Sequence, residues 1–251
     1  MGARPGTFYV VGVGPGDPEL VTLKAMKLLE RSKIWFVPSA FENGGSMALK
    51  IVSGVVEQGD REILSHRFPM KQVHREKEVD PEVKSAWQEA ARTIMDRLEM
   101  GQDVVFPTLG DPAIYSTGFY VCETLQAFGN GFPVEIIPGV SAVGATSAVS
   151  ELPLCLGDER LVIIPATFEN EKIRELLELS EVAVFMKVHK VMPRLVALLE
   201  EMDLLENAVL VERCSLKEQR IWKDVRQAVD QDIHYFSTMV VRRKRASRLQ
   251  C

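Results

Sequence analysis

The stretch FYVVGVGPGDP, residues 8–18, decides the fold class of this 251-residue chain. It opens with a continuous apolar run, Phe8–Val13, which predicts a buried β-strand. The glycines and prolines that follow predict a tight turn. Asp17 is a typical helix N-cap and Pro18 suits the first helical position, so a helix is predicted from Pro18 to about Ser32.

The same alternation of strand and helix runs along the rest of the chain. Further strands are predicted at Ile34–Val37, Asp103–Pro107, Val134–Ile137, Leu161–Pro165, Val182–Lys187, Ala208–Glu212 and Tyr235–Arg242. Further helices are predicted at Met47–Val56, Val83–Met100, Ser116–Phe128, Ser141–Ser150, Glu171–Leu179 and Lys190–Met202. Repeated β–α–β units indicate an α/β fold with mainly parallel sheets and helices on their faces.

The pattern breaks at residues 151–158, which fit neither a helical nor a strand period. We interpret this stretch as a linker between two α/β domains, residues 1–151 and residues 158–251. Residues 40–82 are less regular than the rest of the first domain.

Composition excludes several classes of function. The formal net charge of -5 argues against a nucleic-acid partner bound through the overall field of the protein. No apolar stretch approaches the roughly 20 residues that span a bilayer, and the N-terminus has no signal-peptide pattern. The four cysteines and four histidines lack the close spacing of metal ligands. We expect a cytoplasmic protein with free thiols, no metal and no membrane partner.

Three glycine- and proline-rich loops each follow a predicted strand: Gly12–Pro18, Leu109–Tyr115 and Pro138–Ala142. In open α/β sheets ligands bind beyond the carboxyl ends of the strands, so the three loops could form one site. Glycine there lets the backbone approach a ligand closely.

A dinucleotide site and a plain structural turn are the competing interpretations of the first loop. The sequence from Gly12 begins like the G-x-G-x-x-G fingerprint, but Asp17 occupies the third glycine position and would repel a pyrophosphate. No G-K-[ST] follows the loop either. A non-catalytic module that binds a nucleotide through Gly12–Gly16 stays open on these residues alone.

Taken together, the three loops resemble the signatures of the tetrapyrrole (corrin/porphyrin) methylase family, in the family's order and spacing. The first is GVGPGDPEL at residues 12–20, the second GDPAIYST at residues 110–117, and the third PGVSA at residues 138–142. The two-domain layout agrees over nearly the whole chain. The resemblance implies an enzyme that transfers a methyl group from S-adenosyl-L-methionine to a tetrapyrrole, leaves S-adenosyl-L-homocysteine, and has its active site in the cleft between two domains.

Within the family, DPAIYST at residues 111–117 and SAVGATSA at residues 141–148 are most similar to the C-20 methyltransferases of cobalamin synthesis. Those enzymes act on precorrin-2 or its cobalt-bearing counterpart, cobalt-factor II. The alternatives in the same fold are methylases of another corrin position, of uroporphyrinogen, of a ribosomal RNA ribose or of a diphthamide precursor. The family also implies a homodimer. The sequence does not decide whether the substrate carries cobalt.

The resemblance assigns the cofactor contacts motif by motif. In the first domain they are Pro15, Leu109, Gly110, Asp111, Ile114, Ser141 and Ala142, and in the second Met186, Cys214 and Ser237. A core methionine is the alternative for Met186. Asp111 and Asp17 are also typical turn and capping residues, and for both we favour that structural role.

The remaining site residues follow from the chemistry. Methyl transfer from a sulfonium is a direct displacement that depends on alignment, so no metal or covalent protein intermediate is required. Tyr115 is the candidate catalytic residue for positioning or proton handling, with an aromatic packed under the loop as the alternative. Cations are needed for the substrate carboxylates, and the candidates are Arg67, Lys71, Lys187 and Arg213.

Overall fold

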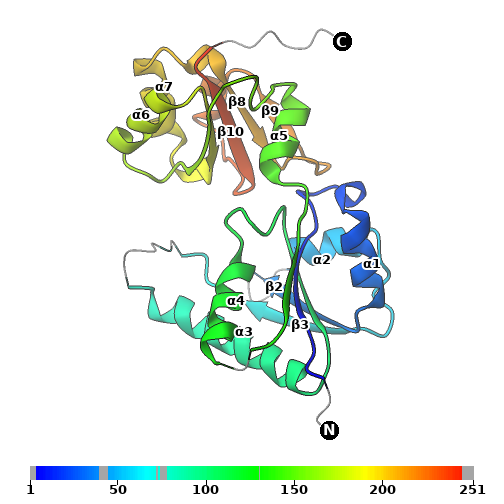
Figure 1. Ribbon diagram of the computed structural model, residues 1–251. Helices are drawn as coiled ribbons and strands as arrows, with labels where there is room; N and C mark the ends of the chain where they lie inside the picture. The colour runs from blue at the N-terminus through cyan, green and yellow to red at the C-terminus, as the bar shows by residue number, and fades with distance from the viewer. Residues whose placement is uncertain (1–3, 40–44, 72, 74–77, 130, 245–251) are drawn as a thin grey trace. The chain divides into compact units, whose positions relative to one another are not determined.

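The computed structural model describes residues 4–39, 45–71, 73, 78–129 and 131–244 (Figure 1). The chain divides into two compact units, Met1–Ser141 and Ala142–Cys251. The boundary therefore precedes helix α5 (Ala142–Ser150) and not the predicted linker at 151–158. The reason is that α5 contacts strands β8 and β10 of the second unit.

The first unit is built on a five-stranded sheet in the order β3-β2-β4-β1-β5. Its strands are β1 (Phe8–Gly12), β2 (Ile34–Ser39), β3 (Glu62–Arg67), β4 (Val104–Thr108) and β5 (Val134–Ile137). Every neighbouring pair is parallel, which confirms the prediction for this part of the chain. All five carboxyl ends therefore lie along one edge of the sheet.

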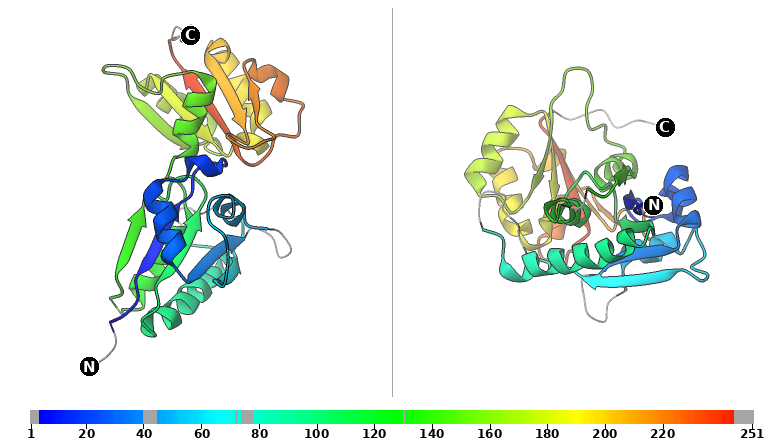
Figure 2. Two further views of the ribbon diagram at one scale, coloured as in Figure 1. Left: turned by 90° about the vertical axis from the view of Figure 1, so that its right-hand side faces the viewer. Right: turned by 60° about the horizontal axis from the view of Figure 1, so that its bottom comes forward.

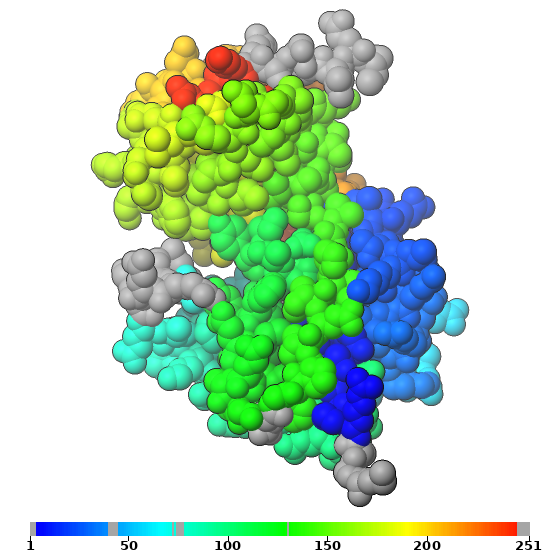
Figure 3. All heavy atoms as spheres, in the orientation of Figure 1, coloured from blue at the N-terminus to red at the C-terminus, as the bar shows by residue number. Residues whose placement is uncertain are grey.

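Helices cover both faces of this sheet. One face packs against α1 (Leu23–Arg31) and α2 (Met47–Val52), and the other against α3 (Pro81–Glu99) and α4 (Thr117–Ala127) (Figures 1 and 2). The central strand β1 sends alternate side chains to the two sides, with Phe8 and Val10 facing α3 and α4 and Tyr9 and Val11 facing α1 and α2. The outer sides of α3 and α4 lie at the surface of the unit (Figure 3).

Two features of the first unit differ from the prediction. The helix expected from Pro18 is a short 3-10 helix, Pro18–Leu20, and α1 starts only at Leu23. Thr22 has an extended backbone, and its hydroxyl accepts a hydrogen bond from Ala25 N, so it caps a new helix. Strand β3 was not predicted, because it lies at the sheet edge and its side chains are exposed or half-buried.

The second unit has a mixed sheet in the order β6-β7-β10-β8-β9. Its strands are β6 (Leu161–Pro165), β7 (Val182–Met186), β8 (Ala208–Glu212), β9 (Arg220–Trp222) and β10 (Ser237–Arg242). Among the described strands of this second sheet, β6 and β7 form the one parallel pair. The expectation of a mainly parallel sheet is therefore wrong for this unit. The link between β8 and β9, residues 213–219, is shorter than the crossover of a dozen or more residues that a parallel neighbour needs.

The core of the second unit lies between this sheet and helices α6 (Asn170–Leu179) and α7 (Met192–Glu201). Short 3-10 helices contribute to the same cluster at Val188–Lys190, Leu205–Asn207 and Val225–Ala228. Helix α5 contacts β10 and β8. The buried Arg242 of β10 binds both carboxylate oxygens of Glu159 and also donates to Pro153 O, which fastens the segment after α5 to the sheet.

Candidate active site

The three predicted loops follow β1, β4 and β5, and hydrogen bonds join them to one another. Gly14 and Gly110 exchange two backbone bonds, with N–O distances of 2.8 Å from Gly110 N and 3.3 Å from Gly14 N. Asp111 Oδ2 accepts a bond of 2.8 Å from Gly139 N. Segments more than 90 residues apart in sequence therefore form one continuous surface at the carboxyl edge of the first sheet.

Glycine is required where these loops meet. A Cβ placed on Gly12 would lie 2.6 Å from Gly139 N and 2.7 Å from Gly110 O, distances that real side chains do not reach. Gly14 and Gly110 also have φ angles of 79° and 72°, in the left-handed region. The loops are thus packed backbone against backbone.

The carboxylates of Asp17 and Asp111 hold the loops in shape. Asp17 Oδ1 accepts from Glu19 N at 2.9 Å and caps the 3-10 helix. Asp111 Oδ1 accepts from Ala113 N at 2.8 Å, so Asp111 is the turn residue that we favoured. The cap of α4 is not Asp111, however, but Ser116, whose Oγ accepts from Gly118 N.

The other predicted residues of the first unit lie on the same loops. Pro15 is buried, and half-buried positions are occupied by Leu109, Ile114, Ser141 and Ala142.

Tyr115, by contrast, is 47% exposed, at the end of the second loop, with φ 53°. Partial burial raises the pKa of its phenol, so the hydroxyl stays protonated near neutral pH. Such a group donates a hydrogen bond more readily than it removes a proton.

Arg67 and Lys71, the candidate cations of the first unit, lie in different surroundings. Arg67 is the exposed last residue of β3 and pairs in register with Ser39, so it lies at the carboxyl edge of the sheet. Lys71 Nζ lies 2.7 Å from Glu82 Oε2 and 2.9 Å from Asp80 Oδ2. The hydrogen bonds that Lys71 donates to Glu82 and Asp80 raise its pKa. These two acidic partners neutralise Lys71.

The predicted contacts of the second unit also gather at one edge of its sheet. Met186 ends β7 and pairs with Thr238, the neighbour of Ser237 at the start of β10. Ser237 in turn pairs with Glu212, two residues before Cys214. Ser237 Oγ is buried and has no hydrogen-bond partner among the described residues. Such a hydroxyl fits a site that a polar ligand completes.

Residues beside this edge hold unusual backbone conformations. The φ angles are 61° at Lys187, 47° at Arg213 and 65° at Ser215. Residues other than glycine and asparagine rarely adopt such values. Burial lowers the pKa of Lys187 and raises that of the Cys214 thiol. Lys187 comes directly after β7, and residues 213–215 come directly after β8.

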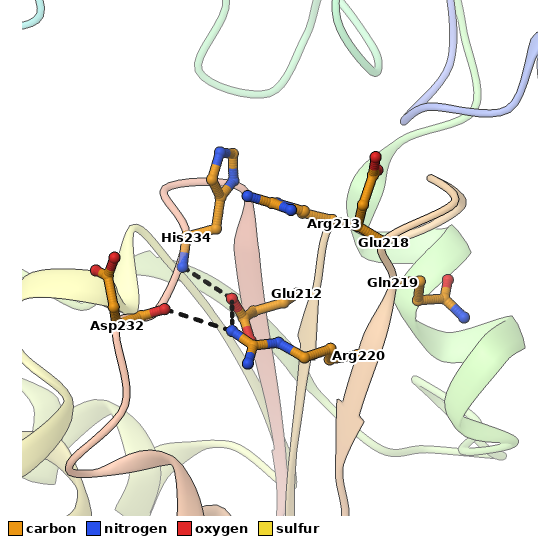
Figure 4. A pocket seen from close by; sticks show the side chains of 7 residues that line it. All are labelled: Glu212, Arg213, Glu218, Gln219, Arg220, Asp232 and His234. Atoms are coloured by element: carbon orange, nitrogen blue, oxygen red, sulfur yellow. Dashed lines mark hydrogen bonds and ion pairs between the residues drawn. The ribbon is translucent and has the colours of Figure 1, made fainter.

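A network around Glu212, which no sequence pattern predicted, supports this edge. The buried Glu212 carboxylate accepts hydrogen bonds from Arg220 Nη2 at 3.0 Å and His234 N at 2.8 Å (Figure 4). It also accepts one from Trp222 Nε1 at 2.9 Å. Burial alone would raise the pKa of Glu212, but these bonds outweigh it and hold the pKa below its usual value. The partners lie 8–22 residues away, so no local motif reveals them.

The network borders a cavity of about 370 Å³ lined by Glu212, Arg213, Glu218, Gln219, Arg220, Asp232 and His234. The Arg213 side chain extends toward the His234 ring (Figure 4). Burial and this neighbouring charge lower the pKa of His234. Arg213, predicted to bind substrate, therefore faces a cavity that also holds acidic groups.

No group of three or more His, Cys, Asp or Glu side chains among the described residues could hold a metal ion. No described helix is long and apolar enough to cross a membrane.

Comparison with known proteins gives this geometry a family. Residues 7–230 match the tetrapyrrole (corrin/porphyrin) methylases, and the match includes all three loops. The chain belongs to this family. Among curated relatives of this tetrapyrrole methylase, the cobalt-precorrin-2 C(20)-methyltransferase of Salmonella typhimurium is 31% identical, over 95% of the chain and 97% of the relative. The precorrin-2 C(20)-methyltransferase of a Sinorhizobium species is 29% identical, over 96% of both.

Solved structures of other methylases share the fold. A cobalt precorrin-4 methyltransferase superimposes with a TM-score of 0.68 at 20% identity, over 94% of both chains. The uroporphyrin-III C-methyltransferase of Thermus thermophilus, complexed with S-adenosylhomocysteine, gives a TM-score of 0.66 at 21% identity, over 95% of this chain and 98% of the other. The α/β fold predicted from the alternation of strands and helices is thereby confirmed for this tetrapyrrole methylase.

Proposed function

We propose that the protein is an S-adenosyl-L-methionine-dependent C-methyltransferase that acts on C-20 of precorrin-2 or cobalt-factor II in cobalamin biosynthesis. The observation that carries the proposal is the joining of the three family loops at one sheet edge, through the Gly14–Gly110 bridge and the Asp111–Gly139 bond. The names of the relatives that match nearly the whole chain support the position and the substrate.

The charge of the loops fits a sulfonium donor better than a diphosphate. Asp17 and Asp111 place two carboxylates on the loops, and both accept hydrogen bonds from backbone N–H groups. A pyrophosphate beside them would be repelled, whereas a cation would not. The proposed donor contacts on the first unit are Pro15, Leu109, Gly110, Asp111, Ile114, Ser141 and Ala142, and on the second Met186, Cys214 and Ser237.

The residues act by binding and orientation. When bound, S-adenosyl-L-methionine supplies an electrophilic methyl carbon. The acceptor carbon of a reduced tetrapyrrole is enamine-like and needs no activating nucleophile from the protein. Alignment within a site can lower such a barrier by up to about 7–11 kcal/mol. The Tyr115 phenol, protonated near neutral pH, is proposed to orient the acceptor by donating a hydrogen bond.

The proposed substrate cations are Arg67, Lys187 and Arg213, since the acceptor carries several carboxylates. Lys71 contributes least, because Glu82 and Asp80 already neutralise it. The family resemblance also supports a cytoplasmic homodimer, and sedimentation equilibrium of the purified chain tests the dimer directly.

The deciding experiment incubates the protein with metal-free precorrin-2 and, separately, with cobalt-factor II. Labelled methyl from S-adenosyl-L-methionine should appear at C-20 by NMR in at least one of them. A methyl at another carbon would assign a different corrin or uroporphyrinogen methylase. Calorimetry with S-adenosyl-L-homocysteine and with NAD separates a methyltransferase from a nucleotide-binding module, which would bind NAD.

A further inference from the structure

A cavity of about 350 Å³ lies on the first unit between helix α1 and strand β5, and none of the predicted site residues lines it. We call it the edge groove. Its base is buried and largely apolar, and consists of Tyr9, Leu28 and Ile137. One side carries the α1 cations Lys24, Lys27 and Arg31. The edge groove therefore combines an apolar contact surface with positive charge.

The three cations differ in whether an acidic group already binds them. Lys24 Nζ lies 2.7 Å from Glu135 Oε1 of β5, so these two charges balance each other. Lys27 and Arg31 are exposed, and neither side chain forms a hydrogen bond or ion pair with another described residue. They are four positions apart on α1, which puts both on one face of the helix. Two positive charges thus line the edge groove without a counter-charge among the described residues.

Strand β5 also has a free main-chain edge beside this groove. It is the last strand in the sheet order and pairs with β1. Phe8 N donates to Pro133 O at 2.9 Å, and Phe8 is in register with Val134. Alternate residues of a strand bond to opposite neighbours, so the N–H and C=O groups of Val134 and Ile136 are directed away from β1. These groups can pair with an added strand.

The two edges of the first sheet differ in charge. Strand β3, at the opposite edge, begins with Glu62 and ends with Arg67. Strand β5 has one charged residue, Glu135, and Lys24 already binds it. Charged side chains protect an edge strand from pairing with another chain, so β5 is the less protected edge. An extended segment that paired with β5 would place alternate side chains in the edge groove.

We propose that the edge groove binds an extended acidic segment of another protein, which adds a strand to β5 and places its carboxylates beside Lys27 and Arg31. Main-chain hydrogen bonds hold such a segment, and the two cations select its charge. The overall charge of -5 repels an acidic partner from the rest of the surface, so its approach depends on this local patch. The groove is separate from the three loops, and the inference does not depend on the proposed methyl transfer.

The test is fluorescence anisotropy of the full chain with a labelled eight-residue peptide in which Glu and Val alternate. This pattern puts every carboxylate on one face of a strand. The wild type should bind it, and Lys27→Glu combined with Arg31→Glu should weaken binding at least about tenfold, since two attractive charges become repulsive.

The matched control combines Lys50→Glu with Lys84→Glu, which makes the same change in net charge. Both lysines are exposed, on α2 and α3. This variant should lose less than about twofold in affinity, because salt screens distant surface charges. Equal losses in the two double variants, or no binding to the wild type, overturn the proposal. Where the charge reversal also lowers the Tm, Lys27→Ala with Arg31→Ala repeats the comparison.

Two further peptides test whether the segment pairs as a strand. One carries a methyl group on the main-chain nitrogen of every Glu, and the other on that of every Val. Only alternate N–H groups of an added strand face β5, so one of these peptides should bind at least about tenfold more weakly than the other. Equal affinity of the two overturns the proposal, because charge alone would then explain the binding.

Two other outcomes would identify a different occupant. A single-stranded oligonucleotide or phosphatidylserine vesicles that bind the wild type more tightly than the peptide does, and that lose binding in Lys27→Glu with Arg31→Glu, would overturn the proposal in favour of a phosphate-bearing partner. A change from dimer to monomer in that variant on sedimentation would overturn it in favour of a contact between two copies of the chain.

Discussion

The two units build the edges of their sheets by different physical means. In the first, parallel strands end in loops that pack backbone against backbone at Gly12, Gly110 and Gly139. In the second, the corresponding edge depends on a buried carboxylate, Glu212, whose bonds hold β9 and the segment before β10. Adding a side-chain carbon at a loop glycine should therefore destabilise the first edge. Removing the Glu212 carboxylate should destabilise the second.

The largest expected effect is at the second edge. Glu212→Ala leaves the Trp222 and His234 N–H groups unsatisfied and should lower the free energy of unfolding by about 3 kcal/mol. Urea denaturation measures this loss. The control is Glu206→Ala, which breaks the exposed ion pair with Arg226 and should cost less than about 0.5 kcal/mol. Equal losses in the two variants would remove the contrast between the units.

Gly12→Ala tests the first edge. Its new methyl would meet Gly139 N and Gly110 O, so the loops must separate at a cost of about 1–3 kcal/mol. We also expect at least about a tenfold loss of affinity for S-adenosyl-L-homocysteine by calorimetry. Gly45→Ala is the control, because nothing lies within 4 Å of its added carbon. Unchanged affinity in Gly12→Ala would show that the joined loops do not form the donor site.

A smaller effect compares two cations of the first unit. Arg67→Ala should raise the KM for the acceptor by about threefold to tenfold, the usual size for one lost charged contact to a partly exposed ligand. Lys71→Ala should change KM little, because Asp80 and Glu82 already neutralise that charge. Steady-state kinetics decides, and the reverse ranking would move the carboxylate site toward α3.

The smallest effect is on stability in mild acid. Burial lowers the folded-state pKa of His66 in the first unit and of His189 and His234 in the second. The unfolded chain therefore binds protons first, so stability is complete above about pH 6.5 and falls as pH drops through the lower folded-state pKa. His66→Gln should flatten the fall in Tm between pH 7 and 5. A steeper fall in that variant would contradict the sign.

The sequence predicted the first unit better than the second for a physical reason. Glycine loops need particular residues at neighbouring positions. The sequences of Gly12–Pro18 and Leu109–Tyr115 therefore predicted that these two loops meet. Strand β3 was not predicted because its side chains at the sheet edge are exposed or half-buried and so lack an apolar pattern. Strand β9 has three residues, too few to show a period. The antiparallel insertion of β10 between β7 and β8 depends on links that carry no periodic signal.

The site residues divide in the same way. Contacts carried by backbone motifs, such as Asp111 with Gly139, could be anticipated from the order of the loops. The Glu212 network and the Lys24–Glu135 pair join side chains from separate elements. Such pairs form only when the helices and strands have packed, and a single sequence does not contain that information.

The left-handed backbone at Tyr115, Lys187, Arg213 and Ser215 has a consequence for protein engineering. Each such conformation costs about 1 kcal/mol or more for a residue with a Cβ. Heat-resistant variants selected without regard to activity should therefore accumulate glycine or asparagine at these four positions. A thermostable descendant obtained in that way would have lost three side chains that we propose for the site, those of Tyr115, Lys187 and Arg213.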